Sequence, residues 1–190
     1  MIQLSVLIPT LHSRKYYFEN ITKVLLNQKS ELEFPGEVEI LSYIDRREKT
    51  TGFKRNALIE QSKGKFVVFV DDDDELDVEY LSLIISAIKE NPEIDAIGIR
   101  GMYSEDGKTQ QPFETSLAHN WEFKNGWYYR TINHISPIKR EHAISVKFPN
   151  KVIGEDYEYT MKLKATGLLK KEVVIKKPIY FYNFVSNKSY

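Results

Sequence analysis

The sequence predicts an α/β fold with a mixed, mostly parallel β-sheet at its centre. Short runs of β-branched and aliphatic residues alternate along the chain with segments whose apolar residues recur at helical spacing. Such alternation is typical of parallel sheets covered by helices. The chain has 190 residues and no stretch with the composition of a linker, so we expect a single domain over residues 1–190.

The first half of the chain carries the regular alternation. Strands are expected at residues 3–8, 37–44, 65–70 and 96–100. Pro9 is expected to end the first strand, because it has no N–H to donate to a neighbouring strand. Helices are expected between the strands, at residues 16–28, 52–62 and 78–88. This order predicts that the carboxyl ends of three parallel strands open on one crevice.

Residues 101–151 depart from this alternation. Asp106-Gly107 predicts a hairpin turn, and aromatic residues that include Trp127 and Tyr129 crowd an otherwise polar stretch. Irregular segments of this kind often form the walls of binding sites. The remaining predicted elements are a helix at residues 157–165 and strand material at residues 172–184, interrupted by Pro178.

The composition argues against several functional classes. Lys plus Arg and Asp plus Glu each number 27, so no net charge attracts anionic lipid, and a nucleic-acid acceptor has no support from charge. The chain has no cysteine, which excludes disulfides and thiolate metal ligands and favours a cytoplasmic location. It has neither the pattern of a signal peptide nor an apolar run of about 18 residues, so we expect no transmembrane segment.

An acidic run follows the third predicted strand, where KFVVFV gives way to Asp71 to Asp74. Four neighbouring carboxylates repel one another, and a hard divalent cation such as Mg²⁺ or Mn²⁺ relieves this repulsion. Mg²⁺ is typically held by one or two carboxylates together with substrate phosphates, which points to a nucleotide diphosphate ligand. Basic residues between Arg46 and Arg55 supply counter-charges for phosphates. The alternative is that the run only caps the following helix.

Four segments follow one another in a characteristic order: LSVLIPTLHSR, the helical segment from Gly52 to Gly64, FVVFVDDDDEL and GEDYEYTMKL. Together they resemble the family-2-like glycosyltransferases of the GT-A fold, and the resemblance covers most of the chain. It implies a three-layer sandwich of the nucleotide-diphospho-sugar transferase type. The expected nucleotide-binding half is residues 1–100, and the expected acceptor and catalytic half is residues 101–190.

The resemblance also implies which residues bind the donor. Matching the family's motifs residue by residue assigns the nucleotide to Thr10, Arg14, Asp45, Arg55, Asp71 and Asp72. The family's metal motif places Asp71 near the ribose and Asp73 on the cation, so these two are the expected ligands of Mn²⁺ or Mg²⁺. Because Asp72 and Asp74 are also aspartates, the motif can be aligned with the run in more than one way.

The Glu155-Asp156 pair resembles the Glu-Asp pair of the same family. The aspartate is the usual base there, so we expect Asp156 to be the catalytic base and Glu155 to orient it or the acceptor. The alternative for both is an electrostatic role at the start of a helix. By the same resemblance His134 is expected on the acceptor or diphosphate side. Trp127 and Tyr129 are candidates for stacking on a sugar, although lone histidines and clustered aromatic residues more often serve the core.

The function implied by the resemblance is metal-dependent sugar transfer, with inversion, from a nucleotide diphosphate donor to an acceptor hydroxyl. The nucleotide is expected to be UDP, and the acceptor a saccharide, a lipid-linked sugar or another hydroxyl compound. Two alternatives stay open: a nucleotide-sugar-binding module without turnover, and a sugar-phosphate nucleotidyltransferase. The second normally has a glycine-rich loop after its first strand, whereas the loop from Pro9 to Arg14 contains no glycine.

Overall fold

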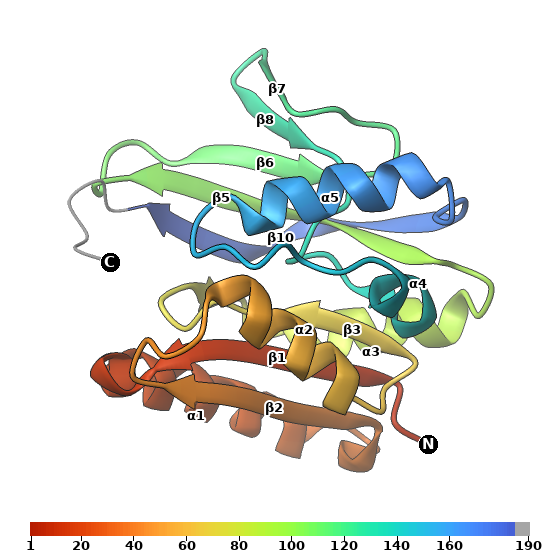
Figure 1. Ribbon diagram of the computed structural model, residues 1–190. Helices are drawn as coiled ribbons and strands as arrows, with labels where there is room; N and C mark the ends of the chain where they lie inside the picture. The colour runs from red at the N-terminus through yellow and green to blue at the C-terminus, as the bar shows by residue number, and fades with distance from the viewer. Residues whose placement is uncertain (185–190) are drawn as a thin grey trace.

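The computed structural model describes residues 1–184 and shows one mixed β-sheet between two layers of helices (Figure 1). Its strands are β1 (Leu4–Leu11), β2 (Val38–Asp45), β3 (Phe66–Phe69), β4 (Glu75–Leu76), β5 (Ala96–Glu105), β6 (Gln111–Thr115), β7 (Glu122–Lys124), β8 (Trp127–Arg130), β9 (Ile138–Lys139) and β10 (Glu172–Phe184). Its helices are α1 (Lys15–Glu31), α2 (Thr51–Gln61), α3 (Tyr80–Glu90), α4 (Arg140–Ser145) and α5 (Glu155–Thr166). None of the described helices is long and apolar enough to cross a bilayer. The predicted α/β class is confirmed.

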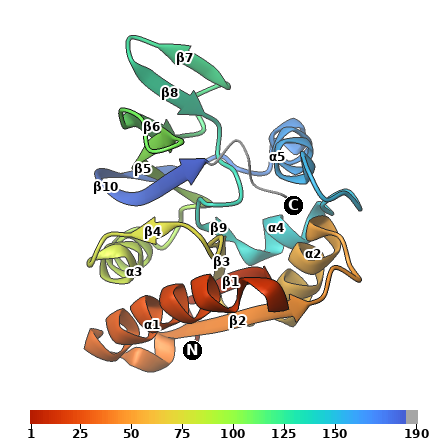
Figure 2. The same cartoon turned by 90° about the vertical axis from the view of Figure 1, so that its left-hand side faces the viewer.

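The strands lie in the order β2-β1-β3-β9-β5-β6-β8-β7, and β10 pairs with β5 and β4. The longest ladders are parallel, with β1 beside β2 and β10 beside β5. β9 joins the two parts of the sheet, because it pairs antiparallel with both β3 and β5. The antiparallel β7–β8 hairpin lies at the end of the sheet opposite β2, at the top of Figure 2. The sheet is therefore mixed and mostly parallel, as predicted.

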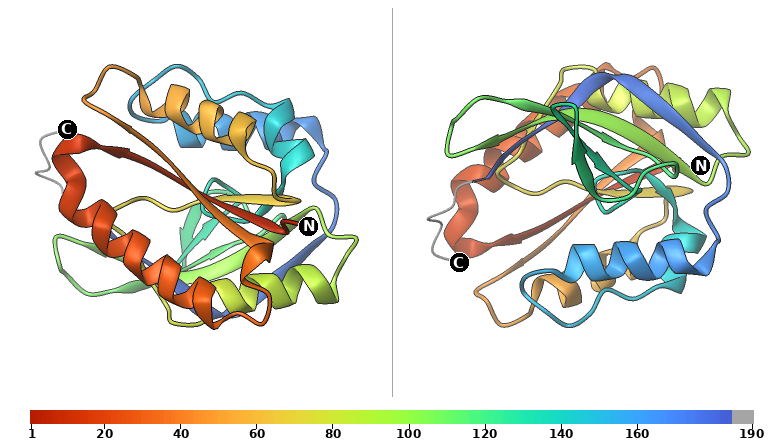
Figure 3. Two further views of the ribbon diagram at one scale, coloured as in Figure 1. Left: turned by 90° about the horizontal axis from the view of Figure 1, so that it is seen from below. Right: turned by 90° about the horizontal axis from the view of Figure 1, so that it is seen from above.

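Helices cover both faces of the β1–β3 part of the sheet. α1 and α3 lie on one face, and α2, α4 and α5 lie on the other (Figure 3). Neighbouring residues of a strand point to opposite faces. Val6 and Val68 therefore pack in the core beneath α1 and α3, while Leu7 and Phe69 pack beneath the other helices. Burial of both faces explains why these strands are apolar throughout.

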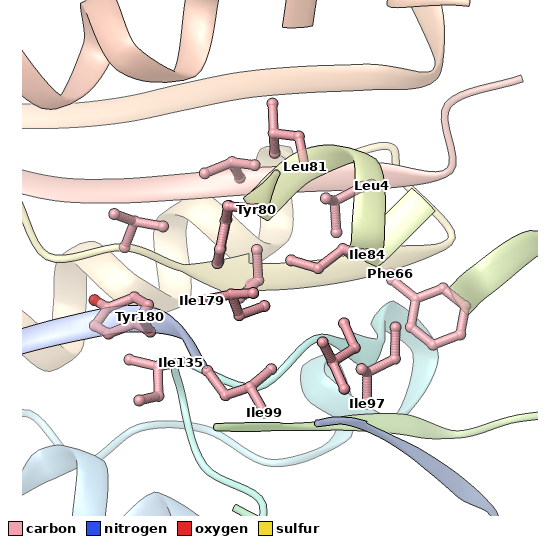
Figure 4. Packing of buried hydrophobic residues seen from close by; sticks show 14 of the residues in the cluster. Leu4, Phe66, Tyr80, Leu81, Ile84, Ile97, Ile99, Ile135, Ile179 and Tyr180 are labelled. Carbon is pink, nitrogen blue, oxygen red and sulfur yellow. The ribbon is translucent and has the colours of Figure 1, made fainter. Parts of the chain in front are cut away.

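A pair of tyrosines lies where the larger core meets the carboxyl ends of the strands. Tyr80 of α3 and Tyr180 of β10 are fully buried near Ile99 and Ile179, and their ring centroids are 6.3 Å apart (Figure 4). The Tyr180 hydroxyl donates a hydrogen bond to Asp74 in the acidic run. The last described strand of the chain thus helps to position the loop that follows β3.

The first strand does not end at Pro9, as the sequence predicts, but continues to Leu11. Pairing with β3 stops at Leu7, whose carbonyl accepts a hydrogen bond from Val70 on that side. Alternate residues of a strand direct their backbone groups to the same neighbouring strand, so the backbone of Pro9 faces the same side as that of Leu7. At this position β3 has already ended. The missing N–H of Pro9 removes no ladder bond, and pairing with β2 continues to Asp45.

The predicted hairpin turn is confirmed, the predicted break at Pro178 is only a shift of register, and one helix is longer than expected. Asp106 and Gly107 adopt φ values of 51° and 69° in the turn between antiparallel β5 and β6. β10 continues through Pro178, and its register with β5 shifts on both sides of this residue. The helix expected at residues 157–165 is α5, which already begins at Glu155. The Glu155-Asp156 pair therefore lies in its first turn.

Candidate active site

The carboxyl ends of β1, β2 and β3 meet at one edge of the sheet. The parallel registers pair Leu11 of β1 with Asp45 of β2, and Leu7 of β1 with Phe69 of β3. The loops that follow these strands are therefore neighbours, as expected for an open parallel sheet. Side-chain contacts of Arg55 and His134 extend this group of loops to the first turn of α5.

Asp72 is anchored by residues that follow β1. Its carboxylate accepts hydrogen bonds from the Thr10 hydroxyl at 2.5 Å, from Arg14 Nε at 2.9 Å and from Arg14 Nη2 at 2.5 Å. Only 4% of the Asp72 side chain is exposed. The hydrogen bond to Asp72 outweighs burial and raises the pKa of Arg14 above its ordinary value. Three residues of the predicted nucleotide-binding set thus hold one another in place.

The four aspartates of the acidic run divide into two pairs. Asp72 and Asp74 are buried, and a tyrosine hydroxyl donates to Asp74 as the arginine does to Asp72. The side chains of Asp71 and Asp73 are more accessible, at 31% and 17% exposure. Asp71 and Asp73 therefore keep more exposed surface than the other two, and each is paired with an arginine: Asp71 with Arg55 at 3.0 Å and Asp73 with Arg14 at 2.9 Å.

Arg55 links the acidic run to the first turn of α5. Its Nη2 donates to Asp71 Oδ1 at 3.0 Å, and its Nε donates to Glu155 Oε1 at 3.2 Å. The guanidinium is buried over the rings of Phe69 and Phe148, at 4.9 and 5.8 Å from their centroids. Burial opposes ionisation of Asp71, but the charge of Arg55 holds the pKa of Asp71 below its ordinary value. Asp71 is thus ionised and fixed in position.

A glycine in α2 allows this link to form. A Cβ atom at Gly52 would lie 1.9 Å from the carbonyl oxygen of Pro149. The Gly52 N–H also donates to the carbonyl oxygen of Lys151 at 3.1 Å. The start of α2 therefore lies directly against the loop that leads into α5. Arg55, one turn further along α2, can reach Glu155 because of this close approach.

The two acidic residues at the start of α5 differ in environment. Burial raises the pKa of Glu155; the charge of Arg55 partly offsets this, and the neighbouring Asp156 reinforces it. The Glu155 side chain is 6% exposed, whereas that of Asp156 is 31% exposed. Asp156 is therefore the member of the pair that is accessible to a substrate, and Glu155 is tied to the protein by its ion pair.

His134 lies between the two accessible carboxylates. Its Nε2 is 3.6 Å from Asp71 Oδ2, and its Nδ1 is 3.7 Å from Asp156 Oδ2. The histidine side chain is itself only 11% exposed. The structure thus brings His134 into the predicted site, with an acidic group from the strand end on one side and an acidic group from α5 on the other.

Asp45 is held by a lysine that the sequence identifies only as one of several counter-charges. Lys54 Nζ donates to Asp45 Oδ1 at 3.1 Å and to the Thr10 carbonyl oxygen at 3.0 Å, and the Lys49 N–H donates to Asp45 Oδ2 at 2.8 Å. Burial opposes ionisation of Asp45, but the Lys49 N–H and Lys54 lower its pKa. An open pocket of about 450 Å³ lies beside it, lined by Ser42, Tyr43, Ile44, Asp45, Glu48 and Lys49.

The accessible aspartates suit a partial metal site. Within residues 1–184, no three His, Cys, Asp or Glu side chains are arranged to hold a metal ion. A Mg²⁺ or Mn²⁺ site of the kind that accompanies a diphosphate needs only one or two carboxylates, because phosphate oxygens and water complete it. Asp71 and Asp73 are hard oxygen ligands with part of their surface accessible, so they fit that requirement.

Among the described residues, the ring contacts of Trp127 and Tyr129 are with each other, Arg100 and His119, and not with the other predicted site residues. Trp127 and Tyr129 stack on each other, with ring centroids 6.2 Å apart and planes inclined by 17°. Side chains alternate along β8, so Tyr128 and Arg130 point to the opposite face. Arg130 is the one whose charge interacts with Asp156. The aromatic segment therefore contributes to the site through residues that the sequence analysis did not select.

Trp121 is another residue that the sequence analysis did not select. Its ring lies against Tyr157, the residue after Asp156, at a centroid distance of 5.3 Å and an angle of 80°. The guanidinium carbon of Arg130 lies 4.9 Å from the centroid of the same ring. The density of aromatic residues was the available signal, but it does not distinguish Trp121 from Trp127.

Comparison with known proteins gives a family match. The sequence profile of glycosyl transferase family 2 matches residues 5–151. Comparison with curated proteins gives no match.

Comparison of structures finds crystal structures of S. aureus TarS. TarS 1-349 in complex with UDP-GlcNAc matches with a TM-score of 0.70 and 19% identity, over 98% of this chain and 60% of that chain. The complex with UDP matches with a TM-score of 0.69 and 20% identity, over 96% and 60% of the two chains. A further TarS structure has a TM-score of 0.66 and 22% identity, and the match covers 96% of this chain and 37% of that one. This chain thus spans less than two thirds of the TarS chains, and it shares their GT-A fold.

Proposed function

The chain belongs to glycosyl transferase family 2, and from this premise we propose that it transfers a sugar, with inversion, from a nucleotide diphosphate donor to an acceptor hydroxyl. The observation that carries the proposal is the pair of accessible carboxylates, Asp71 and Asp156, on the two sides of His134. One lies at a strand end that suits a diphosphate, and the other lies at the start of α5, where an acceptor can approach.

UDP is the proposed nucleotide. Asp45 is ionised beside an open pocket, and a carboxylate oxygen there can accept the N–H of a uracil ring. Thr10, Arg14 and Asp72 shape the loop next to it. S. aureus TarS, which has the same fold, has been crystallised with UDP and with UDP-GlcNAc, and this supports a uridine nucleotide.

Mn²⁺ or Mg²⁺ is the proposed cofactor, with Asp71 and Asp73 as its protein ligands. The support for this assignment is their accessibility and their place at the strand end. A divalent cation at this position supplies positive charge that stabilises the departing nucleotide diphosphate. Arg55 holds Asp71 in place for this role.

Asp156 is the proposed base. Its carboxylate accepts the proton of the acceptor hydroxyl while the hydroxyl oxygen forms a bond to the anomeric carbon. The bond from that carbon to the diphosphate oxygen breaks, and its electron pair leaves with the nucleotide diphosphate. Attack from the side opposite the leaving group inverts the configuration. Glu155, which is bound to Arg55, keeps the first turn of α5 in position.

The proposed acceptor is a saccharide, a lipid-linked sugar or another hydroxyl compound. We propose the cytoplasm as the site of action, since a chain without cysteine suits a reducing compartment.

Thermal unfolding in the presence of nucleotides tests the proposal. A ligand that binds only the folded state raises the midpoint, and at 100 times Kd the shift is about 5 °C or more for a chain of this size. UDP with Mn²⁺ is expected to give such a shift, which EDTA should reduce; Mn²⁺ alone and UDP alone are the controls. If neither UDP, GDP nor TDP shifts the midpoint with Mn²⁺ present, the proposed function is wrong.

A further inference from the structure

Arg130 differs from the other arginines that are buried or half-buried. The guanidinium groups of Arg14, Arg55 and Arg100 are bound by carboxylates, and that of Arg140 donates to a serine hydroxyl and a backbone carbonyl. The Arg130 guanidinium has neither a hydrogen bond nor a carboxylate oxygen within 4.0 Å among residues 1–184; its contacts are with the rings of Trp121 and Phe113. It is a half-buried cation without a carboxylate partner among the described residues.

Two aromatic rings fix the orientation of this cation. The guanidinium carbon lies 4.9 Å from the centroid of Trp121 and 5.9 Å from that of Phe113. Contact with the faces of aromatic rings stabilises a guanidinium while its N–H groups remain available for hydrogen bonds in the plane. Burial lowers the pKa of Arg130, and neighbouring groups that include Asp156 offset this in part. A bound anion would relieve the cost of desolvating this charge.

The position of Arg130 assigns it to the acceptor side of the site. Asp156, the proposed base, is among its strongest electrostatic neighbours, whereas the aspartates of the acidic run are not. Trp121, on which Arg130 lies, also contacts Tyr157, the residue after Asp156. Arg130, Trp121 and Tyr157 therefore form one cluster of contacting side chains next to the base.

We propose that Arg130 and Trp121 form a subsite for an anionic group, a phosphate or a carboxylate, carried by the acceptor near the hydroxyl that Asp156 deprotonates. The planar guanidinium matches two oxygens of either group. The half-buried ring of Trp121 adds apolar surface beside the guanidinium for the sugar or polyol that carries this group. This inference rests on the proposed function, and it specifies the chemical class of the acceptor.

Tryptophan fluorescence provides a direct readout, because the chain has only two tryptophans. In a Trp127→Phe background the remaining Trp121 reports on the subsite. Glucose 6-phosphate, glucuronate and glucose are titrated into this protein with UDP and Mn²⁺ present. We expect saturable binding of at least one anionic probe and none of glucose at the same concentrations. Comparison of the two anionic probes distinguishes a phosphate from a carboxylate.

Substitution of the arginine then tests its role. Arg130→Gln is expected to weaken binding of the anionic probe at least tenfold and to leave the Kd of UDP unchanged. Arg130→Lys, which keeps the charge, should retain part of the affinity and serves if the glutamine variant does not fold. Arg100→Gln is the matched control, because Arg100 also lies over an aromatic ring, that of residue 127, but pairs with Glu114 on the other face; it should leave probe binding unchanged.

Four results would overturn the inference. Equal binding of glucose and the anionic probes, or binding of none of them, would show that the subsite does not select an anion. Weaker UDP binding by Arg130→Gln would assign the arginine to the donor instead. In these three cases UDP binding by the parent protein would leave the proposed function standing. Failure of UDP to bind the parent protein would remove both proposals.

Discussion

Arg55 and Asp71 form an ion pair, with 3.0 Å between Nη2 and Oδ1, that connects α2 to the acidic run after β3. The arginine is buried, whereas the aspartate side chain keeps 31% of its surface exposed. One partner thus anchors the other at the surface of the site. This arrangement supplies an ionised carboxylate that does not need to be ordered when a ligand arrives.

Removing the Tyr180 hydroxyl should destabilise the acidic run. Tyr180→Phe leaves the buried carboxylate of Asp74 without this donor, and it also removes the oxygen that accepts the Asp71 N–H at 3.3 Å. We expect a loss of about 1–3 kcal/mol in the free energy of unfolding, measured by urea denaturation. Tyr159→Phe is the matched control: Tyr159 is equally buried but donates only to a backbone carbonyl, at 3.3 Å. Equal losses in the two variants would contradict this role of Tyr180.

Lys54 should be required for donor binding. Lys54→Met removes the cation that binds Asp45 and the Thr10 carbonyl, so Asp45 loses the partner that orients it. We expect UDP affinity, measured by calorimetric titration, to fall about tenfold, which corresponds to about 1.4 kcal/mol. Lys63→Met is the control, because Lys63 is exposed and its N–H donates to Glu39 near the start of β2, at the other end of the strand from Asp45; this variant should bind UDP as the parent does. Unchanged affinity in Lys54→Met would separate Asp45 from the nucleotide.

A methyl group at residue 52 should disturb the link between α2 and α5. Gly52→Ala places a Cβ 1.9 Å from the Pro149 carbonyl oxygen, so the backbone of one segment has to move. We expect a loss of about 1–3 kcal/mol in stability and weaker UDP binding, because Arg55 shifts with α2.

Gly36→Ala serves as the control for this prediction. A Cβ at Gly36 meets no atom within 4 Å, and Gly36 is not among the glycines with positive φ. Its unfolding free energy should stay within about 0.5 kcal/mol of the parent. A Gly52→Ala protein as stable as Gly36→Ala would show that the close approach is not needed.

Asp95 should give the chain a measurable loss of stability in acid. The backbone N–H groups of Lys170 and Lys171 and the side chains of Lys139 and His142 outweigh burial and hold the pKa of Asp95 below its ordinary value. The unfolded chain therefore binds more protons at this group, and its stabilisation is present above pH of about 4 and lost as the pH falls through the lower, folded value.

Asp95→Asn provides the test of this pH dependence. At pH 7 the variant should be less stable than the parent by about 2 kcal/mol. The difference should shrink as the pH falls from about 4 towards 2. Urea denaturation of both proteins across this range measures it, and a difference that stays constant with pH would rule out titration of Asp95 as the cause.

The sequence predicts the strand ends well because they depend on local pattern. β1 and β3 are continuous apolar runs, and each is followed by a polar loop where burial ends. Because the carboxyl ends of parallel strands meet at one edge of the sheet, Thr10 and the acidic run could be placed there together. Extension of β1 past Pro9 could not be predicted. It depends on β3 ending at Phe69, which is a property of a neighbouring strand.

The roles of individual side chains in the site depend on distant partners. Asp74 is buried because Tyr180 reaches it from β10, and Asp72 because Arg14 follows β1. No local pattern in the acidic run contains that information. Likewise, whether Trp127 or Arg130 contributes to the site depends on which face of β8 each side chain occupies. A shift of the β8 register by one residue would exchange the two faces.

The most direct test of the account is the rate of UDP release from a UDP-sugar by Asp156→Asn, with Mn²⁺ and a saccharide acceptor found by array screening. We expect a rate reduced about 100-fold or more, with the Kd of UDP within about twofold of the parent. Asp73→Asn should instead weaken Mn²⁺-dependent UDP binding itself. Release at the parental rate by Asp156→Asn would show that Asp156 is not the base.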